Sequence, residues 1–123
     1  MPKLTGTVIV IDDDPSLLRA LRRLLLAVDL SVLVFDSAEA FLAARVPPGK
    51  VCLLLDIYLL GSGIDLCKTL AASGRNLPTI LMTARDDEVT QKNARAAGAV
   101  GTLFKPFEED VLLDAIARAL GKG

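Results

Sequence analysis

Five short apolar runs alternate along the chain with five amphipathic stretches, and this alternation constrains the fold more than any other feature. The runs lie at residues 8–11, 32–35, 51–55, 79–82 and 100–104. All but the second and the last are almost continuously apolar, which is typical of parallel strands covered by helices on both faces. Strands and helices joined by short connections predict one doubly wound α/β domain with right-handed crossovers.

The amphipathic stretches carry signals for the starts and ends of helices. Asp14 can cap a first helix that has Pro15 at its first position, and Ser37 can cap a second. Gly74 and Gly98 are expected to end the third and fourth helices. These two and the fifth helix are expected over residues 64–73, 87–97 and 108–120. The apolar positions expected to face inward are Leu17, Leu21, Leu24, Leu25 and Val28 in the first helix, Ala40, Phe41 and Ala44 in the second, and Val111, Leu112, Ala115, Ile116 and Ala119 in the fifth.

The composition limits the classes of protein to which the chain can belong. Its 123 residues fit a single domain over residues 1–123, with a core from about 7 to 120, and 52% hydrophobic residues suffice for packing. A net charge of −1 without a long basic run argues against nucleic-acid binding. No signal peptide is recognisable and no run is long enough to span a bilayer, so we expect a soluble cytoplasmic protein. Cys52, inside the third run, is expected to be an inert core thiol.

Acidic residues stand directly after two of the apolar runs. Asp12 and Asp13 follow the first run, and Asp56 follows the third. The carboxyl ends of parallel strands meet at one crevice of an open sheet, where ligands bind. Like charges crowded there repel one another, so one acid must take up a proton or a cation must join them. Carboxylates without histidine suit a hard cation such as Mg2+.

Two further polar residues follow the other strands that should end at this crevice. Thr83 comes after the fourth run and Lys105 after the fifth. Asp12 and Asp13 would hold Mg2+, while Asp56 would both bind the ion and attack phosphorus as an oxygen nucleophile. Lys105 would neutralise charge on the phosphoryl oxygens, and Thr83 would donate its hydroxyl to one of them. The set therefore predicts phosphoryl transfer to an aspartate.

Each of these residues also has a simpler interpretation when it is taken alone. Asp12 and Asp13 alone are also compatible with solvated loop acids, although this is the less favoured interpretation, and a threonine or lysine after a strand is ordinary. Asp14 is interpreted only as a helix cap. Only the combination at the ends of four strands favours a site. The acids assigned to helix starts, with no chemistry, are Asp65, Asp86, Asp87, Glu108, Glu109 and Asp110.

Four short motifs give the chain a strong resemblance to a known family. They are Val10-Ile11-Asp12-Asp13-Asp14, Leu54-Leu55-Asp56, Met82-Thr83-Ala84 and Phe104-Lys105-Pro106-Phe107. Over residues 8–120 the chain resembles the receiver domain of two-component response regulators, in the CheY-like superfamily. Residues 37–42 and 98–100 are most similar to its FixJ branch, in which a LuxR-type DNA-binding domain usually follows the receiver. The resemblance also implies a cis peptide bond between Lys105 and Pro106.

The resemblance implies a fold, a cofactor and a partner. The fold would be a flavodoxin-like three-layer (βα)5 sandwich with a five-stranded parallel sheet in the order 2-1-3-4-5. A sensor histidine kinase would donate a phosphoryl group to Asp56, and the receiver would catalyse only its own phosphorylation and dephosphorylation. Asp13, Asp56 and the backbone carbonyl of Tyr58 would bind Mg2+ directly. Asp12 would act mainly through metal-bound water.

The chain departs from the family pattern at three places. The loop at residues 57–63 is one residue short and has Leu60 where proline is usual. Thr102 replaces the tyrosine or phenylalanine that often stands three residues before the lysine. Tyr58 and Arg85 are large where they would flank the phosphoryl group, so we expect them to hinder the attacking water and prolong phosphorylation. Geometry and family analogy also suggest a homodimer through the fourth helix, fifth strand and fifth helix.

Three other functions remain open on the sequence alone. A degenerate receiver would act as a protein-interaction module without phosphate, which the altered loop favours and the intact acids, threonine and lysine oppose. An aspartate-nucleophile phosphatase would carry a second acid where Tyr58 stands. A flavin-binding protein of this fold would need a phosphate-cradling loop, but Asp12, Asp13 and Asp14 would repel phosphate there. The end of the chain at Gly123 is compatible with a truncated regulator and with a stand-alone one.

Overall fold

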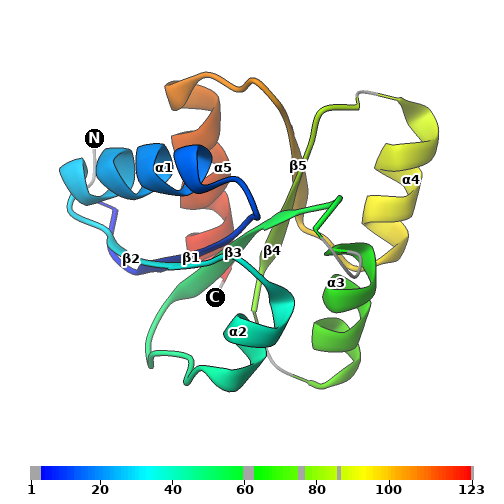
Figure 1. The fold of residues 1–123 in the computed structure, drawn as a ribbon, viewed down its shortest axis with the longest axis horizontal. Coiled ribbons are helices and arrows are strands. Elements are labelled where there is room, and N and C mark those ends of the chain that lie inside the picture. Colours follow the sequence, from blue (N-terminus) through cyan, green and yellow to red (C-terminus); the bar gives the residue numbers. More distant parts are fainter. Residues whose placement is uncertain (1–3, 60–62, 75–76, 86, 123) are drawn as a thin grey trace.

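Within the described residues, 4–59, 63–74, 77–85 and 87–122, the computed structural model of the chain contains one sheet of five parallel strands (Figure 1). The strands are β1 (Thr7–Ile11), β2 (Ser31–Phe35), β3 (Val51–Asp56), β4 (Thr79–Thr83) and β5 (Gly101–Phe104). Their order in the sheet is β2-β1-β3-β4-β5. The strand order implied by the resemblance is therefore confirmed.

Helices cover both faces of the sheet and make it the middle of three layers (Figure 1). In the described part of the chain they are α1 (Pro15–Ala27), α2 (Ala38–Ala43), α3 (Gly63–Ala72), α4 (Glu88–Ala96) and α5 (Glu109–Lys122). Helices α1 and α5 pack on one face, and α2, α3 and α4 pack on the other. The doubly wound, flavodoxin-like (βα)5 architecture is therefore confirmed as well.

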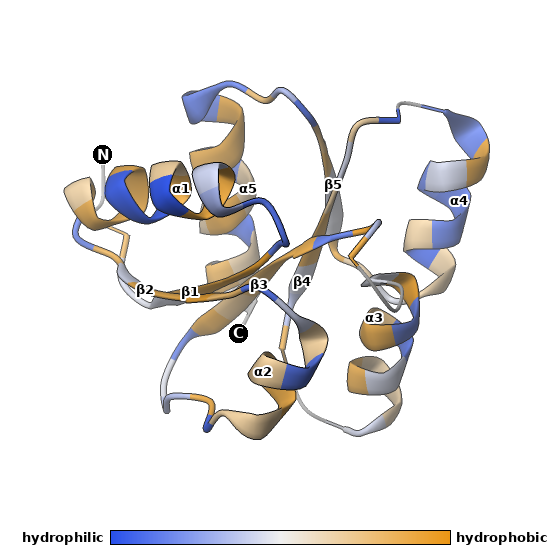
Figure 2. Ribbon diagram, viewed as in Figure 1, coloured by the Kyte–Doolittle hydropathy of each residue, from blue (hydrophilic) through white to orange (hydrophobic). Residues whose placement is uncertain are grey.

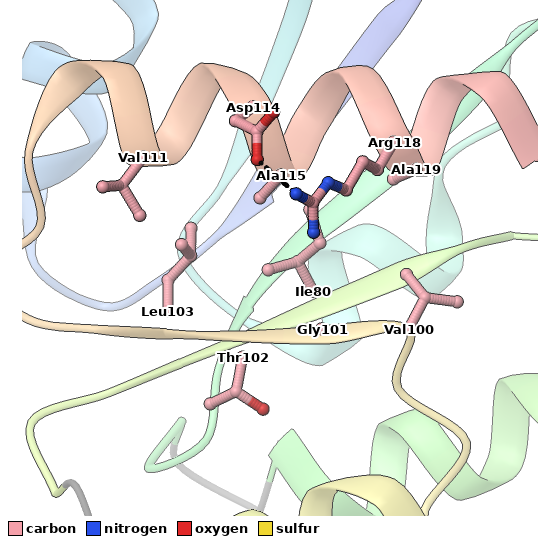
Figure 3. A pocket seen from close by; sticks show the side chains of 10 residues that line it. All are labelled: Ile80, Val100, Gly101, Thr102, Leu103, Val111, Asp114, Ala115, Arg118 and Ala119. Carbon is pink, nitrogen blue, oxygen red and sulfur yellow. Dashed lines mark ion pairs between the residues drawn. The ribbon is translucent and has the colours of Figure 1, made fainter.

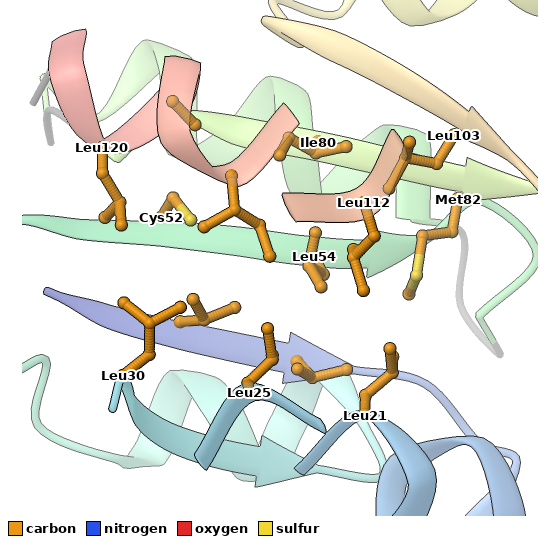
Figure 4. Close-up of a cluster of buried hydrophobic side chains, with 14 of the residues drawn as sticks. Leu21, Leu25, Leu30, Cys52, Leu54, Ile80, Met82, Leu103, Leu112 and Leu120 are labelled. Carbon is orange, nitrogen blue, oxygen red and sulfur yellow. The ribbon is translucent and has the colours of Figure 1, made fainter. Parts of the chain in front are cut away.

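The central strands are apolar because helices cover them on both sides. Every residue of β1, β3 and β4 is buried. Successive side chains of a strand point to opposite faces, so each strand contributes to two separate hydrophobic clusters. Leu54 belongs to the cluster that β1, β3 and β4 form with α1 and α5 (Figure 4). In the hydropathy view, β1, β2 and β3 are mostly hydrophobic, while hydrophobic and hydrophilic residues alternate along the helices (Figure 2).

The apolar stripe of α1 agrees in part with the predicted one. Leu18, Leu21 and Leu25 are buried against the sheet, whereas Leu17 and Leu24 are only partly buried. Leu21 and Leu25 are thus buried as predicted, Leu17, Leu24 and Val28 are partly buried against the same core, and the burial of Leu18 was not predicted.

Three other local expectations are wrong. Ala40 is exposed, because α2 is a six-residue helix whose buried residue is Phe41. Val111 is 51% exposed, because it lies in the first turn of α5 beside the edge strand of the sheet. Strand β5 begins at Gly101, and Val100 before it is exposed. The deviations at Val100 and Val111 thus fall next to the edge strand β5, where the sheet ends.

The ends of the helices follow the predicted signals. Asp14, Ser37 and Asp87 accept hydrogen bonds from backbone N–H groups in the first turns of α1, α2 and α4. Gly74 and Gly98 lie beyond the ends of α3 and α4 with φ angles of 75° and 96°, which glycine adopts without strain. The cap at Asp14 starts α1 directly after the acidic residues that follow β1.

Several remaining expectations can be compared with the structure. The peptide bond between Lys105 and Pro106 is cis, as the resemblance implied. Cys52 is fully buried, and this burial raises the pKa of its thiol to about 12, so it is a core thiol as predicted. Asp86 and Leu60 lie outside the described residues. No helix in the described stretches has both the length and the apolar character needed to cross a membrane.

Leu54, in the middle of β3, has no exposed surface, so its truncation tests the packing of the core. Leu54→Ala should leave a cavity and lower the free energy of unfolding by about 3 kcal/mol, as measured by urea denaturation. Leu42→Ala is the control, because Leu42 is 51% exposed on α2. It should cost less than about 0.5 kcal/mol. Equal losses in the two variants would contradict this burial pattern.

Candidate functional site

Three aspartates meet at the carboxyl ends of β1 and β3. Ile11 pairs with Leu55 across these neighbouring parallel strands, so Asp12 and Asp56 come next to each other at the strand ends. One carboxylate oxygen from each of Asp12, Asp13 and Asp56 lies within 4.8 Å of the others. Asp12 and Asp56 are buried, with 1% and 6% of their surface exposed, while Asp13 is exposed. The structure thus brings together the three acids that the strand ends predicted.

Backbone groups hold the two buried acids in place. Asp12 Oδ1 accepts a hydrogen bond from the backbone N–H of Asp14 at 2.9 Å, which also sets the start of α1. Asp56 Oδ1 accepts a bond from the backbone N–H of Tyr58 at 3.2 Å. This bond to Tyr58 was not predicted from the sequence, although an aspartate often accepts from the backbone two residues onward in a turn. Both carboxylates are therefore oriented before any ligand arrives.

Lys105 enters the acid cluster from the end of β5. Its Nζ donates to Asp12 Oδ2 at 2.9 Å and to Asp56 Oδ1 at 3.5 Å. The backbone N–H of Lys105 donates to the carbonyl of Thr83 at 2.7 Å, which ties the residue to the end of β4. The second side-chain bond is long, so Lys105 pairs mainly with Asp12 and only loosely with Asp56.

Burial and charge shift the protonation of the cluster. Burial raises the pKa of Asp56 above its ordinary value and the charge of Asp12 raises it further, while Lys105 and the Tyr58 N–H oppose the shift. Burial lowers the pKa of Lys105, but the hydrogen bond and charge of Asp12 and the charge of Asp56 outweigh it, so the net shift is upward. One lysine therefore does not fully compensate the acids around Asp56.

Thr83 lies at the same edge of the sheet, but its side chain bonds to a backbone group and not to the acid cluster. It is fully buried at the end of β4, and Asp56 pairs with the preceding residue, Met82. Thr83 Oγ1 accepts a hydrogen bond from the backbone N–H of Arg85 at 3.0 Å. A hydroxyl can also donate a hydrogen bond, so Thr83 has the chemistry to bind an oxygen at the acid cluster once its side chain turns toward it.

The two bulky residues near the cluster are both on the surface. Tyr58 is 55% exposed, and Arg85 is exposed at the start of the loop after β4. Tyr58 lines a hollow of about 340 Å3 together with residues of the same loop and of α3 and α4, among them Ile64 and Asn93. The shortened part of this loop at Leu60 lies outside the described residues. Tyr58 is thus placed at the border between the acid cluster and the α3–α4 surface.

The donor set of the cluster fits Mg2+. Carboxylate oxygens are the ligands that this ion prefers, and it commonly binds through a few carboxylates while keeping several waters. A partly exposed cluster, with Asp13 at the surface, leaves room for those waters. A divalent cation would also relieve the repulsion that raises the pKa of Asp56.

The sequence matches the family model described as the response regulator receiver domain over residues 8–117. That match covers most of the chain, and the chain therefore belongs to the response regulator receiver family. The strand order and the acid cluster at the ends of β1 and β3 agree with this assignment.

Relatives and solved structures place the chain near the FixJ branch. Nodulation protein W of Bradyrhizobium diazoefficiens is 39% identical over 113 residues, which are 91% of this chain and 50% of that protein. Transcriptional regulatory protein FixJ of Azorhizobium caulinodans is 37% identical over 92% of this chain and 54% of that protein. The response regulator StyR has a similar structure, with a TM-score of 0.85 and 42% identity over 96% of this chain and 60% of that one. The chain thus spans about half the length of the curated relatives it matches.

Asp56→Asn should stabilise the metal-free protein at pH 7. Because the folded state raises the pKa of this carboxyl, the folded state binds its proton more tightly than the unfolded state, and the ionised group costs stability as the pH rises. At pH 7 the variant should have a higher melting temperature than wild type, and its free energy of unfolding should be larger by on the order of 1 kcal/mol. That advantage should shrink as the pH falls and vanish below about 4, where the carboxyl is protonated in the folded and the unfolded state.

Thermal melts in EDTA at several pH values measure this effect. The matched control is Asp36→Asn, because Asp36 is an exposed acid just after β2 and outside the cluster. The control should show no such pH-dependent gain. A gain for Asp56→Asn that is absent at pH 7, or equal at every pH, would contradict the raised pKa that burial and the charge of Asp12 give to Asp56.

Proposed function

We propose that this chain is a phosphorylatable receiver of a two-component system, in which a sensor histidine kinase transfers a phosphoryl group to Asp56. The observation that carries the proposal is the arrangement around this residue. Asp56 is a nearly buried carboxylate that shares a cluster with Asp12 and Asp13 and lies beside the ammonium group of Lys105. A nucleophile, a cation site and a fixed positive charge are the parts that transfer to a carboxylate needs.

The hydrogen bonds of Asp56 favour one of its oxygens as the nucleophile. Among the contacts of the described residues, the Tyr58 N–H and Lys105 Nζ both go to Oδ1, which leaves Oδ2 available. Oδ2 would form the new P–O bond while the P–N bond of the donor phosphohistidine breaks, and the electron pair of that bond would leave with the imidazole nitrogen. Lys105 would then meet a phosphoryl oxygen, since its bond to Asp56 is already long.

Asp12, Asp13 and Asp56 would hold Mg2+, with Asp12 acting mainly through a bound water and the backbone carbonyl of Tyr58 as a further ligand. When bound, the ion supplies positive charge that lets the phosphoryl oxygens approach the carboxylates. The chain would have no external substrate to turn over, because the acceptor is its own residue. It would act as a switch that also catalyses its own slow dephosphorylation in the cytoplasm.

Thr83 and Lys105 would pass the change in phosphorylation to the surface formed by α4, β5 and α5. To reach a phosphoryl oxygen, the Thr83 hydroxyl would turn away from the backbone N–H of Arg85, which would release the loop that precedes α4. Phosphorylation is then proposed to promote a homodimer through this surface. The output would be transcription, through a LuxR-type domain outside this sequence, since a relative is named as a transcriptional regulatory protein.

A hollow in the proposed dimer surface supports this part of the proposal. It has a volume of about 470 Å3 between β5 and α5 (Figure 3). Its lining includes the exposed Val100 and Val111, and an ion pair of 3.1 Å joins Arg118 and Asp114 at its rim. The Thr102 side chain points to the other side of β5 (Figure 3), where it lines a second hollow of about 260 Å3 with Gln91 and Arg95 of α4. The small Thr102 stands there where the family often has an aromatic ring, so we expect little movement of Thr102 itself on phosphorylation.

Incubation with Mg2+ and acetyl phosphate should add one phosphoryl group to the wild-type chain, as measured by intact-protein mass spectrometry. Asp56→Asn should abolish the addition, because no other acid ends β3. The exposed-acid variant Asp36→Asn is the control and should be labelled like wild type. Equal labelling of Asp56→Asn would refute the assignment of the acceptor. No labelling of the wild type would favour the phosphorylation-independent receiver.

The phosphorylated state should be long-lived for a receiver, because Tyr58 and Arg85 border the site and hinder the attacking water. Replacing both by alanine should speed the release of phosphate several-fold. The measurement is the decay of the phosphorylated mass after the donor is removed, in excess Mg2+. Val89→Ala is a surface control, because Val89 is 69% exposed on α4 and is not part of the acid cluster. A double variant no faster than wild type would show that these side chains do not shield the bond.

A further inference from the structure

We infer that Gly63, the first residue of α3, positions the acceptor Asp56 by leaving room for its main chain. The inference rests on the proposed function, since it assigns Gly63 a part in the same site. Gly63 is buried, and its backbone N–H donates to the carbonyl of Ile57 at 3.1 Å. The sequence singled out this residue only as the end of a shortened loop. In the structure, Gly63 lies against the main chain of the acceptor Asp56.

The close approach involves the backbone of Asp56 rather than a flexible side chain. A Cβ atom added to Gly63 would overlap the carbonyl oxygen of Asp56 and would lie 3.0 Å from its carbonyl carbon and 3.0 Å from the Cα of Ile57. Real Cβ atoms essentially never come closer than that to other heavy atoms. The φ angle of Gly63 is not in the left-handed region, so space and not backbone conformation demands glycine here.

Neither side of this contact can move away freely. On one side, Asp56 pairs with Met82 of β4, and the N–H of Ile57 donates to the carbonyl of Met82 at 2.9 Å. On the other side, α3 is anchored by its buried residues Leu66 and Cys67. A side chain at position 63 would therefore push the peptide of Asp56 out of its place between the sheet and α3.

A shift of that peptide would reach the carboxylate. The carbonyl of Asp56 accepts the N–H of Leu59 at 3.2 Å, and its Oδ1 accepts the N–H of Tyr58 at the same distance, so peptide and side chain belong to one turn. The contact from Oδ1 to Lys105 Nζ is already 3.5 Å and would be the first to be lost. Misplacement of a reacting group by about 1 Å can cost on the order of a hundredfold in rate.

The test compares Gly63→Ala with Gly121→Ala in the whole chain. Gly121 is the control, because it lies in α5, has no positive φ and has nothing within 4 Å of an added Cβ. Each variant is assayed for Mg2+ affinity and for its rate of phosphorylation by acetyl phosphate, at a temperature where circular dichroism shows that it is folded. Gly63→Ala should lose at least about tenfold in both quantities. Gly121→Ala should match wild type.

A folded Gly63→Ala with a lower melting temperature but wild-type Mg2+ affinity and phosphorylation would overturn the inference, since it would show a structural role only. A second measurement compares the effect of Gly63→Ala on Mg2+ affinity in the wild type and in the Asp56→Asn variant. The loss of affinity should be much smaller in the Asp56→Asn variant. Equal losses in the two backgrounds would also overturn the inference. If the wild type binds Mg2+ but takes no phosphoryl group, the proposed function is wrong. The Mg2+ affinities of the variants would then still test the role of Gly63.

A measurement on the wild type covers the case in which Gly63→Ala does not fold. Addition of Mg2+ should shift the amide resonance of Gly63 together with those of Asp56 and Tyr58 in NMR spectra. The amide of Gly74, at the far end of α3, should stay in place. A Gly63 amide that is insensitive to Mg2+, while Asp56 responds, would show that the two are not coupled.

Discussion

The repulsion among Asp12, Asp13 and Asp56 is the constraint on which the rest of the account depends. Two of these carboxylates are almost completely buried, and all three offer an oxygen within 4.8 Å of the others. Among the described residues, the ammonium group that pairs with these acids is that of Lys105, which lies 2.9 Å from Asp12 and 3.5 Å from Asp56. The metal-free site is therefore short of positive charge. In the proposed function, this shortage of positive charge favours the binding of Mg2+, and transfer of a phosphoryl group follows.

Packing of the sheet compensates for the free energy that this unfavourable cluster of charges costs. The fully buried strands β1, β3 and β4 supply stabilising hydrophobic packing, so that the strand ends can carry a destabilising set of charges. Parallel neighbours bring Asp12 and Asp56 together, while the main-chain bonds from Asp14 and Tyr58 hold the two carboxylates in place. Position and orientation thus come from different sources, the strands and the turns that follow them.

This division explains how much could be predicted from the sequence. Continuous apolar runs followed by polar residues predicted a parallel sheet and the meeting of the acids with Lys105, because parallel strand ends share one edge. The strand order was implied only by the resemblance to the receiver family. The turns could not be predicted, since the bond from Tyr58 to Asp56 and the approach of Gly63 depend on the path of the loop. The same is true of Val111, whose exposure depends on the hollow beside β5 and not on its place in the helical pattern.

The most direct test of the central claim is to locate a divalent cation in crystals of the wild-type chain grown with Mn2+ in place of Mg2+, by anomalous diffraction. The account predicts one strong anomalous peak within coordination distance of the carboxylates of Asp13 and Asp56 and near Asp12, and its loss in Asp13→Asn. A peak at another place, or no peak at the cluster at millimolar Mn2+, would contradict the proposed cation site and the phosphoryl transfer built on it.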